Sequence, residues 1–138
     1  MRILALDIGT KTIGVAVSDE LCISANGVKT VKRKSIKSDL DELKEIVDEY
    51  CPVEIVVGLP YREDGSLSKR GRDIEQFSKK IGAEFNLPIL YFDESFSTHF
   101  AEKALIEADL SRKKRKKVID KMAAVMILQG YLESRDNP

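Results

Sequence analysis

Residues 3–18 read ILALDIGTKTIGVAVS, and this stretch decides the fold. It contains two strand-like segments, at 2–7 and 12–18, separated by a short turn around Gly9, where a positive φ would cost little. A third strand is expected at 28–31, after the turn-prone Ala25-Asn26-Gly27. Three consecutive strands with short connections predict an antiparallel meander.

Helices and strands alternate after this meander. The expected elements are, in order, a helix that begins near the N-cap candidate Ser38 and ends before Pro52, a strand at 54–57, a helix through 74–85, a strand at 88–92, a helix capped by Ser97 or Thr98, and a final helix from about 116 to 133. Helical connections favour parallel pairing through right-handed crossovers. The sequence therefore predicts a single α/β domain over residues 1–138. Its mixed five-stranded central sheet combines the antiparallel meander with parallel strands and is flanked by helices.

The composition is typical of a soluble globular protein. The chain has 138 residues, 43% hydrophobic and 33% charged, and no stretch is long and apolar enough to span a bilayer. The short apolar run after Met1 and Arg2 lacks the length of a secretory signal, so we expect a cytoplasmic protein without a membrane partner. The isolated Cys22 and Cys51 are expected to be buried or half-buried thiols, because their spacing suggests neither a zinc site nor a disulfide framework.

Charge is balanced overall but unevenly distributed along the chain. The formal net charge of zero argues by itself against non-specific binding of nucleic acids. Acids nevertheless crowd residues 39–49, and basic residues crowd 29–37. A second basic run consists of Arg112, Lys113, Lys114, Arg115, Lys116 and Lys117. Such runs are usually solvated, but a polarised surface is also what a phosphate-binding protein needs.

Three carboxylates are predicted to converge. Asp7 and Glu94 each close an apolar strand, and ligands of such sheets gather beyond the carboxyl ends of the strands. Asp120 opens a helical stretch and shares a face with Ala123 and Ala124, whose small side chains allow close packing on the sheet. Acidic oxygens beside cations suit hard divalent metals and the phosphodiesters that they activate.

Each acid also has an ordinary structural interpretation. Asp7 is placed like a turn residue that accepts a backbone hydrogen bond. Asp93 would face the opposite side of its strand from Glu94, so only one of the two can point into a common site. Asp120 could be a solvated helix residue neutralised by Lys116 or Lys117 one turn earlier.

Smaller features complete the set of candidates. The turn after Asp7 contains Gly9, Thr10 and Lys11, which would let backbone amides and a cation approach a phosphate. Ser18 and Asp19 follow the second strand and are expected to form a turn, with support of the acidic site as the alternative. The single histidine, His99, resembles a surface residue at a helix start.

Four motifs carry a resemblance to a known family. They are Asp7-Ile8-Gly9-Thr10-Lys11 with Gly14-Val15-Ala16-Val17-Ser18-Asp19, Val57-Gly58-Leu59-Pro60 followed by Asp64-Gly65, Asp93-Glu94 with Ser97-Thr98, and Asp120-Lys121-Met122-Ala123-Ala124 leading to Ile127-Leu128-Gln129. In this order they resemble the YqgF-type pre-16S rRNA nucleases, which are relatives of the RuvC-like Holliday junction resolvases in the RNase H-like superfamily. The resemblance covers nearly the whole chain. It implies an RNase H-like fold with Asp7, Glu94 and Asp120 as catalytic and metal-binding acids.

The resemblance also implies a reaction. We expect phosphodiester hydrolysis with Mg²⁺ or Mn²⁺ as the cofactor, by two ions about 3.5–4 Å apart that Asp7 bridges. Lys11 and the 112–117 run would hold the nucleic acid, which is structured RNA such as the precursor of 16S rRNA, or branched DNA. Ribosomal particles are expected partners, and the protein is expected to be a monomer or a weak homodimer. The supporting residues are Gly9, Thr10, Ser18, Asp19, Gly58, Pro60, Asp93 and Thr98.

Two departures from the family pattern keep other functions open. Many members carry Arg where this chain has Ser95, and often Arg where it has Thr12, so two cations near the acids are missing. One alternative is a Holliday junction resolvase, and another is a non-catalytic RNA- or ribosome-binding factor on the same scaffold. Asp7-Ile8-Gly9-Thr10 also resembles the phosphate loop of sugar kinases and actin-like ATPases, but 138 residues leave no room for the second domain that those proteins need.

Overall fold

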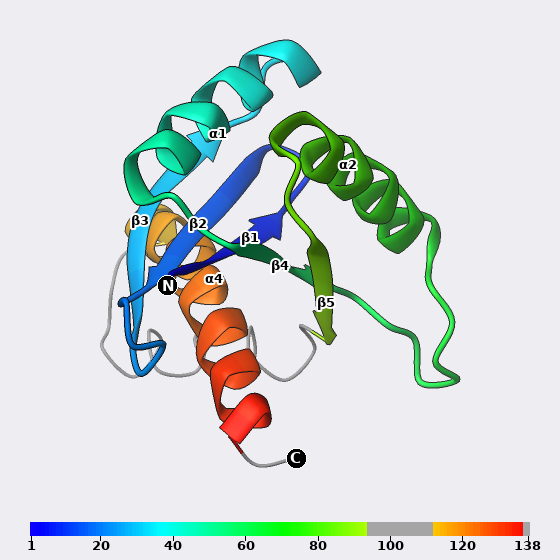
Figure 1. Cartoon of the computed structure of the whole chain (residues 1–138). Helices are drawn as coiled ribbons and strands as arrows, with labels where there is room; N and C mark the ends of the chain where they lie inside the picture. The colour runs from blue at the N-terminus through cyan, green and yellow to red at the C-terminus, as the bar shows by residue number, and fades with distance from the viewer. Residues whose placement is uncertain (94–111, 137–138) are drawn as a thin grey trace.

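The computed structural model describes residues 1–93 and 112–136, with the backbone alone for 112–121 and 136. Its elements are β1 (Ile3–Ile8), β2 (Thr12–Ser18), β3 (Ala25–Lys32), α1 (Ile36–Tyr50), β4 (Glu54–Leu59), α2 (Lys69–Phe85), β5 (Ile89–Asp93) and α4 (Arg112–Asp136). The strands form one sheet in the order β3-β2-β1-β4-β5 (Figure 1). The β3, β2 and β1 strands pair antiparallel, whereas β4 pairs in parallel with both β1 and β5. The predicted mixed sheet, a meander joined to parallel strands, is therefore confirmed.

Helices cover both faces of this sheet, with α1 and α2 on one side and α4 on the other (Figure 1). Alternating side chains of the central strand divide the core between the two sides. Leu4, Leu6 and Ile8 of β1 pack in the cluster that includes α1 and α2. Ile3 and Ala5 pack with α4. A strand buried on both faces explains why β1 is almost continuously apolar.

The first helix begins earlier than predicted. Its N-cap is Ser35, not Ser38: Ser35 has an extended backbone, and its Oγ accepts a hydrogen bond from the Ser38 N–H at 3.1 Å. Ser38 is itself inside the helix, so its amide receives the cap rather than providing it. The helix ends at Tyr50, before Pro52 as expected, and Cys51 caps it in the left-handed region with a φ of 49°.

The predicted turn at Ala25-Asn26-Gly27 is wrong, because these residues belong to β3. The pairing of β3 with β2 shifts register between Val15 and Ala16, and this irregularity accommodates a glycine within a strand. At the first turn, Gly9 does not have the positive φ that we expected. Glycine is needed there for space, since a Cβ would lie 3.0 Å from the carbonyl oxygen of Thr12.

Other expectations are partly met. The helix α2 begins at Lys69 after the N-cap Ser68, and α4 begins at Arg112, four residues before the predicted start. The helix expected after Ser97 or Thr98, and His99 with it, lies outside the described residues. Cys22 is half-buried as expected, but Cys51 is exposed, so that expectation was wrong for the second thiol. Within residues 1–93 and 112–136, no helix has the length and apolar character needed to cross a bilayer.

Candidate functional site

Asp7 lies near the carboxyl end of the central strand and is half-buried. Because Ile3 and Ala5 face α4, alternation along β1 directs Asp7 toward the same side of the sheet. Its partner across the antiparallel pair is Gly14 of β2. On the other side, Gly58 follows Val57, which pairs with Leu6. Neither glycine carries a side chain that could cover the Asp7 carboxylate.

The helix α4 packs on this side of the sheet. Ala123, Ala124, Ile127 and Leu128 are all buried, and the helix contacts β1, β2 and β3 most extensively. Asp120 belongs to α4 by its backbone and precedes Ala124 by one turn, but its side chain lies outside the described part. Small residues at 123 and 124 let this part of the helix approach the sheet closely, as the sequence suggested.

The other end of α4 is anchored at the start of β4. The Tyr131 hydroxyl donates a hydrogen bond to Glu54 Oε1 at 3.1 Å, and Arg135 Nη1 lies 3.6 Å from the same oxygen. Burial, followed by the hydrogen bond to Glu54, raises the pKa of Tyr131, so the hydroxyl remains a donor at neutral pH. Gly130 meets the Phe92 ring of β5. These contacts fix the helix relative to two parallel strands.

The side chains of β5 alternate between the two sides of the sheet, as those of β1 do. Leu90 and Phe92 pack on the α4 side, whereas Ile89 and Tyr91 pack with α1 and α2. Asp93 is the last residue of β5, pairs with Leu59 and is half-buried. Glu94 lies outside the described residues, as does Thr98.

The turn between β1 and β2 is held by backbone hydrogen bonds. Gly9 N–H donates to the Thr12 carbonyl at 2.8 Å, and Arg33 N–H donates to the Lys11 carbonyl at 2.8 Å. Arg33 Nη1 also donates to the Gly9 carbonyl at 2.8 Å. The Gly9 amide is therefore engaged within the turn rather than directed at a ligand. Thr10 and Lys11 are exposed, so the Lys11 ammonium remains accessible at this end of the sheet.

Ser18 and Asp19 lie at the opposite end of β1 from Asp7. The buried Ser18 Oγ accepts a hydrogen bond from Ile3 N–H at 2.8 Å. Asp19 Oδ1 accepts from Ile23 N–H at 2.7 Å and from Ser24 N–H at 3.0 Å, and these bonds lower the pKa of Asp19. Asp19 has the contacts of a turn-forming residue, as expected, whereas Ser18 is the last residue of β2 and bonds to β1, so the expectation of a turn was wrong for Ser18. Any support that they give to Asp7 passes through the strand.

The three predicted acids are the kind of ligands that a divalent metal uses, and Asp7 is the one whose side chain the structure describes. Asp7 offers hard carboxylate oxygens at the half-buried end of a strand, which fits Mg²⁺ or Mn²⁺. Among the side chains that the structure describes, no three His, Cys, Asp or Glu residues are grouped closely enough to hold a metal. Gly58 is buried in β4 and Pro60 follows it half-buried, so both shape the strand end rather than provide ligands.

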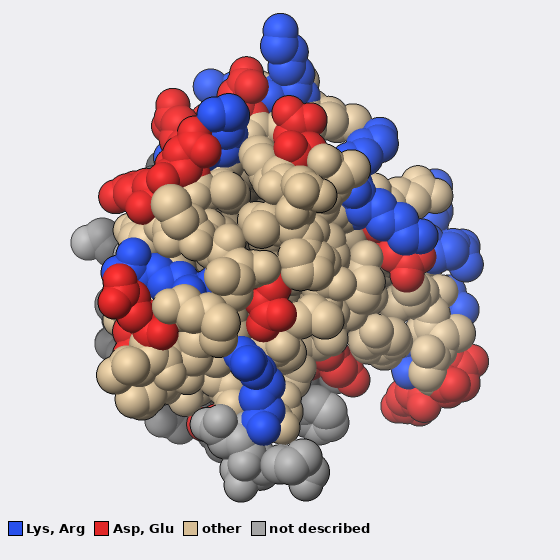
Figure 2. Space-filling model, in the orientation of Figure 1, with Lys and Arg blue, Asp and Glu red and all other residues tan. Residues whose placement is uncertain are grey.

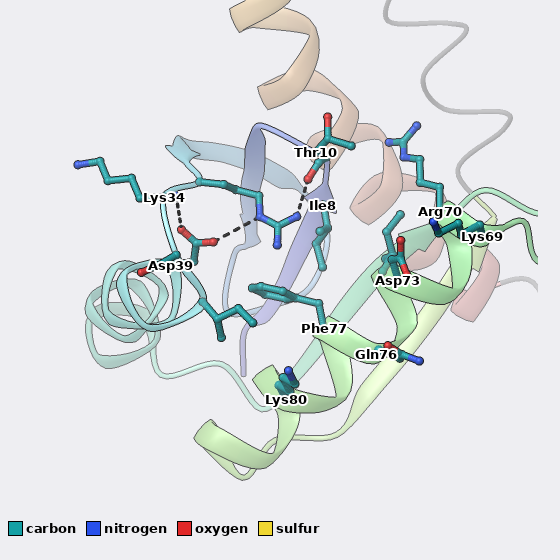
Figure 3. Close-up of a pocket in the computed structure, with 15 residues that line it drawn as sticks. Ile8, Thr10, Lys34, Asp39, Lys69, Arg70, Asp73, Gln76, Phe77 and Lys80 are labelled. Atoms are coloured by element: carbon teal, nitrogen blue, oxygen red, sulfur yellow. Dashed lines mark hydrogen bonds and ion pairs between the residues drawn. The ribbon is translucent and has the colours of Figure 1, made fainter.

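A groove that the sequence did not predict lies on the other side of the sheet, between the starts of α1 and α2. Its volume is about 900 Å³, and we call it the α1–α2 groove (Figure 3). It is lined by Ile8, Gly9, Thr10, Arg33, Lys34, Ser35, Ile36, Asp39, Lys69, Arg70, Asp73, Ile74, Gln76, Phe77 and Lys80. One signal was available: in both Arg33-Lys34-Ser35 and Ser68-Lys69-Arg70, two cations adjoin a helix N-cap.

Comparisons with known proteins place this architecture in a family. A family model described as "RuvX: Holliday junction resolvase" matches residues 1–134. A protein of Clostridium novyi is 50% identical over 134 residues, which cover 97% of this chain and 99% of the relative. A protein of Bacillus subtilis is 50% identical over 136 residues, with coverage of 97% and 99%. Both relatives are named "Putative pre-16S rRNA nuclease".

Solved structures show the same fold. RuvC of T. thermophilus, in complex with a Holliday junction substrate, matches with a TM-score of 0.63 and 13% identity, covering 99% of this chain and 97% of RuvC. The Fowlpox virus resolvase, also with junction DNA, matches with a TM-score of 0.62 and 16% identity, covering 98% and 99%. The RNase H-like fold that the resemblance implied is confirmed.

Proposed function

This chain belongs to the RuvX family, and we propose that it is a divalent-metal-dependent nuclease that processes the 5′ end of the 16S rRNA precursor. The observation that carries the proposal is a sequence identity of 50%, over nearly the full length of both chains, with relatives named "Putative pre-16S rRNA nuclease". An enzyme of this kind is a hydrolase acting on ester bonds. Its substrate would be structured RNA in the cytoplasm, free or within ribosomal particles, and the protein would act as a monomer or a weak homodimer.

Alternation in the sheet supports a common site for the three predicted acids. Asp7 continues the α4-facing series of Ile3 and Ala5. If the alternation of Leu90 and Phe92 continues past the end of β5, Glu94 would share the α4 side and Asp93 would face the other side. Asp120 is one helical turn before the buried Ala124, so helical periodicity is consistent with a side chain toward the sheet.

In the proposed reaction each residue has a distinct role. When bound, Mg²⁺ or Mn²⁺ would make water a stronger nucleophile and stabilise charge on the departing oxygen. Asp7 would hold the metal from the centre of the sheet, and Glu94 and Asp120 would complete the ligand set. Lys11 and the basic run at 112–117, which forms the first turns of α4, would hold the phosphate backbone beside the acids.

Replacement of Asp7 tests the proposal directly. Asp7→Asn keeps the shape of the side chain but removes the charge, so cleavage of labelled precursor RNA should fall to background, as should wild-type cleavage in EDTA. Asp41→Asn is the matched control, because Asp41 is an exposed acid on α1. Undiminished metal-dependent cleavage by Asp7→Asn would refute the assignment. The circular dichroism spectrum of each variant verifies that the fold is intact.

Resolution of Holliday junctions is the second candidate, because the matching family model carries that description. A labelled four-way DNA junction in the same assay separates the two candidates. Preferential, EDTA-sensitive cleavage of the junction would favour the resolvase. Tight RNA binding without EDTA-sensitive cleavage of either substrate would instead favour a non-catalytic factor.

A further inference from the structure

We propose that the α1–α2 groove binds a single-stranded segment of the substrate, gripping its phosphate backbone outside the cleavage site. The inference rests on the proposed function, because it takes Asp7 as the position of cleavage. It adds a binding surface on the opposite side of the sheet from the Asp7 side chain.

The groove carries an excess of positive charge. Arg33 and Asp39 neutralise each other, since Arg33 Nε lies 3.3 Å from Asp39 Oδ2. The other charged side chains of the lining are Lys34, Lys69, Arg70, Lys80 and one acid, Asp73. Within the part of the chain that the structure describes, none of these four cations has an ion-pair partner. Figure 2 shows Lys and Arg side chains gathered at the upper right, over this part of the molecule.

The position of these cations costs stability, which indicates a role in binding. Lys69 and Arg70 occupy the first turn of α2, which has no acid in that turn. The positive end of the helix dipole makes a cation there unfavourable. The N-terminus of α1, at Ser35 and Ile36, faces the same groove. Two helix N-termini and these four cations together create a potential that favours anions.

The distance between the lysines that line the groove along α2 favours a strand over a small ligand. Lys69, Asp73, Gln76 and Lys80 recur at helical spacing along α2 and all line the groove. Lys69 and Lys80 are eleven residues apart, which is about 16 Å along a helix axis. A single phosphate cannot contact both ends of such a stripe, whereas an extended backbone can.

Arg33 and Phe77 form the floor of the groove. The Arg33 guanidinium lies 4.6 Å from the centre of the Phe77 ring and also donates to the Gly9 carbonyl. Figure 3 shows Phe77 in the middle of the groove, with Lys69 and Arg70 to one side of it. Lysines around an apolar floor contact phosphates as point charges and do not read bases. The binding should therefore be independent of sequence.

The groove connects to the proposed cleavage site through the β1–β2 turn. Ile8, Gly9 and Thr10, which follow Asp7 directly, all line it. A nucleic acid that reaches both places must bend around the carboxyl edge of the sheet. Duplex DNA has a persistence length of about 150 base pairs and resists such a bend, so a single strand is the form that fits.

The test measures binding without cleavage, using full-length protein that carries Asp7→Asn. Into it we would introduce Lys69→Ala, Arg70→Ala and Lys80→Ala together. The matched controls are Lys79→Ala and Lys44→Ala, because these exposed lysines lie outside the groove and pair with Glu75 and Asp48 on their own helices. Fluorescence anisotropy over a range of salt concentrations would follow a single-stranded RNA of about 16 nucleotides and an RNA duplex of the same length.

We expect the triple variant to bind the single strand more weakly. The slope of log affinity against log salt should become shallower by about 0.7 for each lost phosphate contact, or by about 2 for three. The duplex and both control variants should behave as the parent protein does. An equal loss for the duplex would overturn the inference, as would an unchanged slope. Inorganic phosphate or AMP that binds with the affinity of the single strand would also overturn it, by indicating a small-ligand pocket.

The two proposals fail in different ways. If the triple variant keeps the salt slope of its parent while Asp7-dependent cleavage is observed in the wild type, the groove inference fails and the nuclease assignment stands. If the slope changes as expected but the wild type shows no EDTA-sensitive cleavage, the groove binds RNA and the nuclease assignment fails.

Discussion

Substitution of Gly130 by Ala tests how α4 is seated against the sheet. A Cβ at this position would lie 2.7 Å from Phe92 Cζ and 2.9 Å from Cε1, so the helix or the ring must shift. Overpacking of this kind costs about 1–3 kcal/mol. The replacement also removes a glycine from a helix interior, which stabilises the folded state by about 1 kcal/mol. The net expectation is a loss of about 1 kcal/mol in the free energy of unfolding.

The sign of this effect should depend on Phe92. In a Phe92→Leu background the ring atoms are absent, so only the helix-propensity gain remains and Gly130→Ala should become neutral or stabilising. Urea denaturation of the four proteins of this double-mutant cycle measures the coupling. The packing argument is refuted if Gly130→Ala stabilises the wild type, or if its effect is the same in both backgrounds.

The same cycle has a functional readout. Phe92 is two residues before Glu94, and Gly130 lies on the helix that carries Asp120. A displacement of α4 against β5 should therefore move two of the proposed acids apart, and a misplacement of 1 Å can cost about 100-fold in rate. Cleavage by Gly130→Ala should fall at temperatures where the protein is fully folded, and Phe92→Leu should partly restore it.

Two further predictions concern the far end of β1. Ser18→Ala leaves the buried Ile3 amide without its acceptor and should cost about 1–3 kcal/mol, visible as a lower urea midpoint; an unchanged midpoint would mean that the bond is not needed. Asp19 has a pKa below its ordinary value of 3.8, because Ser24 and Ile23 N–H groups stabilise its charged form. The contribution of Asp19 to the free energy of unfolding is present above pH 3.8 and is lost as the pH falls through the pKa of the folded state. In Asp19→Asn the free energy of unfolding should therefore fall less steeply than in the wild type as the pH is lowered below about 4. The same pH dependence in the two proteins would contradict this.

The strands and helices were largely predictable, because the local pattern of apolar residues indicates which positions are buried. The continuous apolar run of β1 predicts a strand that is buried on both faces, and the spacing of Leu43 and Ile46 in α1 predicts one buried face. Boundaries were less predictable, because the same chemistry recurs nearby. Ser35 and Ser38 are equally plausible caps, and only the conformation of the chain selects the first. Gly27 resembles a turn residue, but its place opposite a register shift depends on a distant strand.

The two candidate sites also differed in how far local sequence could predict them. Asp7 could be assigned to a strand end from its neighbours alone, and alternation then fixes its side of the sheet. The α1–α2 groove could not be predicted, because Arg33 and Phe77 come together only through the packing of two helices. No local pattern encodes that distance. The roles of Glu94 and Asp120 stay predictions that the cleavage assay must test.

The seating of α4 on β1 has a consequence for how the protein is made. The strand ends at Ile8 and the helix begins at Arg112, so most of the sequence separates two elements that touch. Contacts this distant in sequence form late and slow the folding rate. Until α4 is synthesised, the side of the sheet that contains Ala5 and Ala16 lacks the helix that packs on it in the folded protein. Synthesis of α4 then closes this hydrophobic layer, and under the proposed assignment it adds Asp120 in the same step.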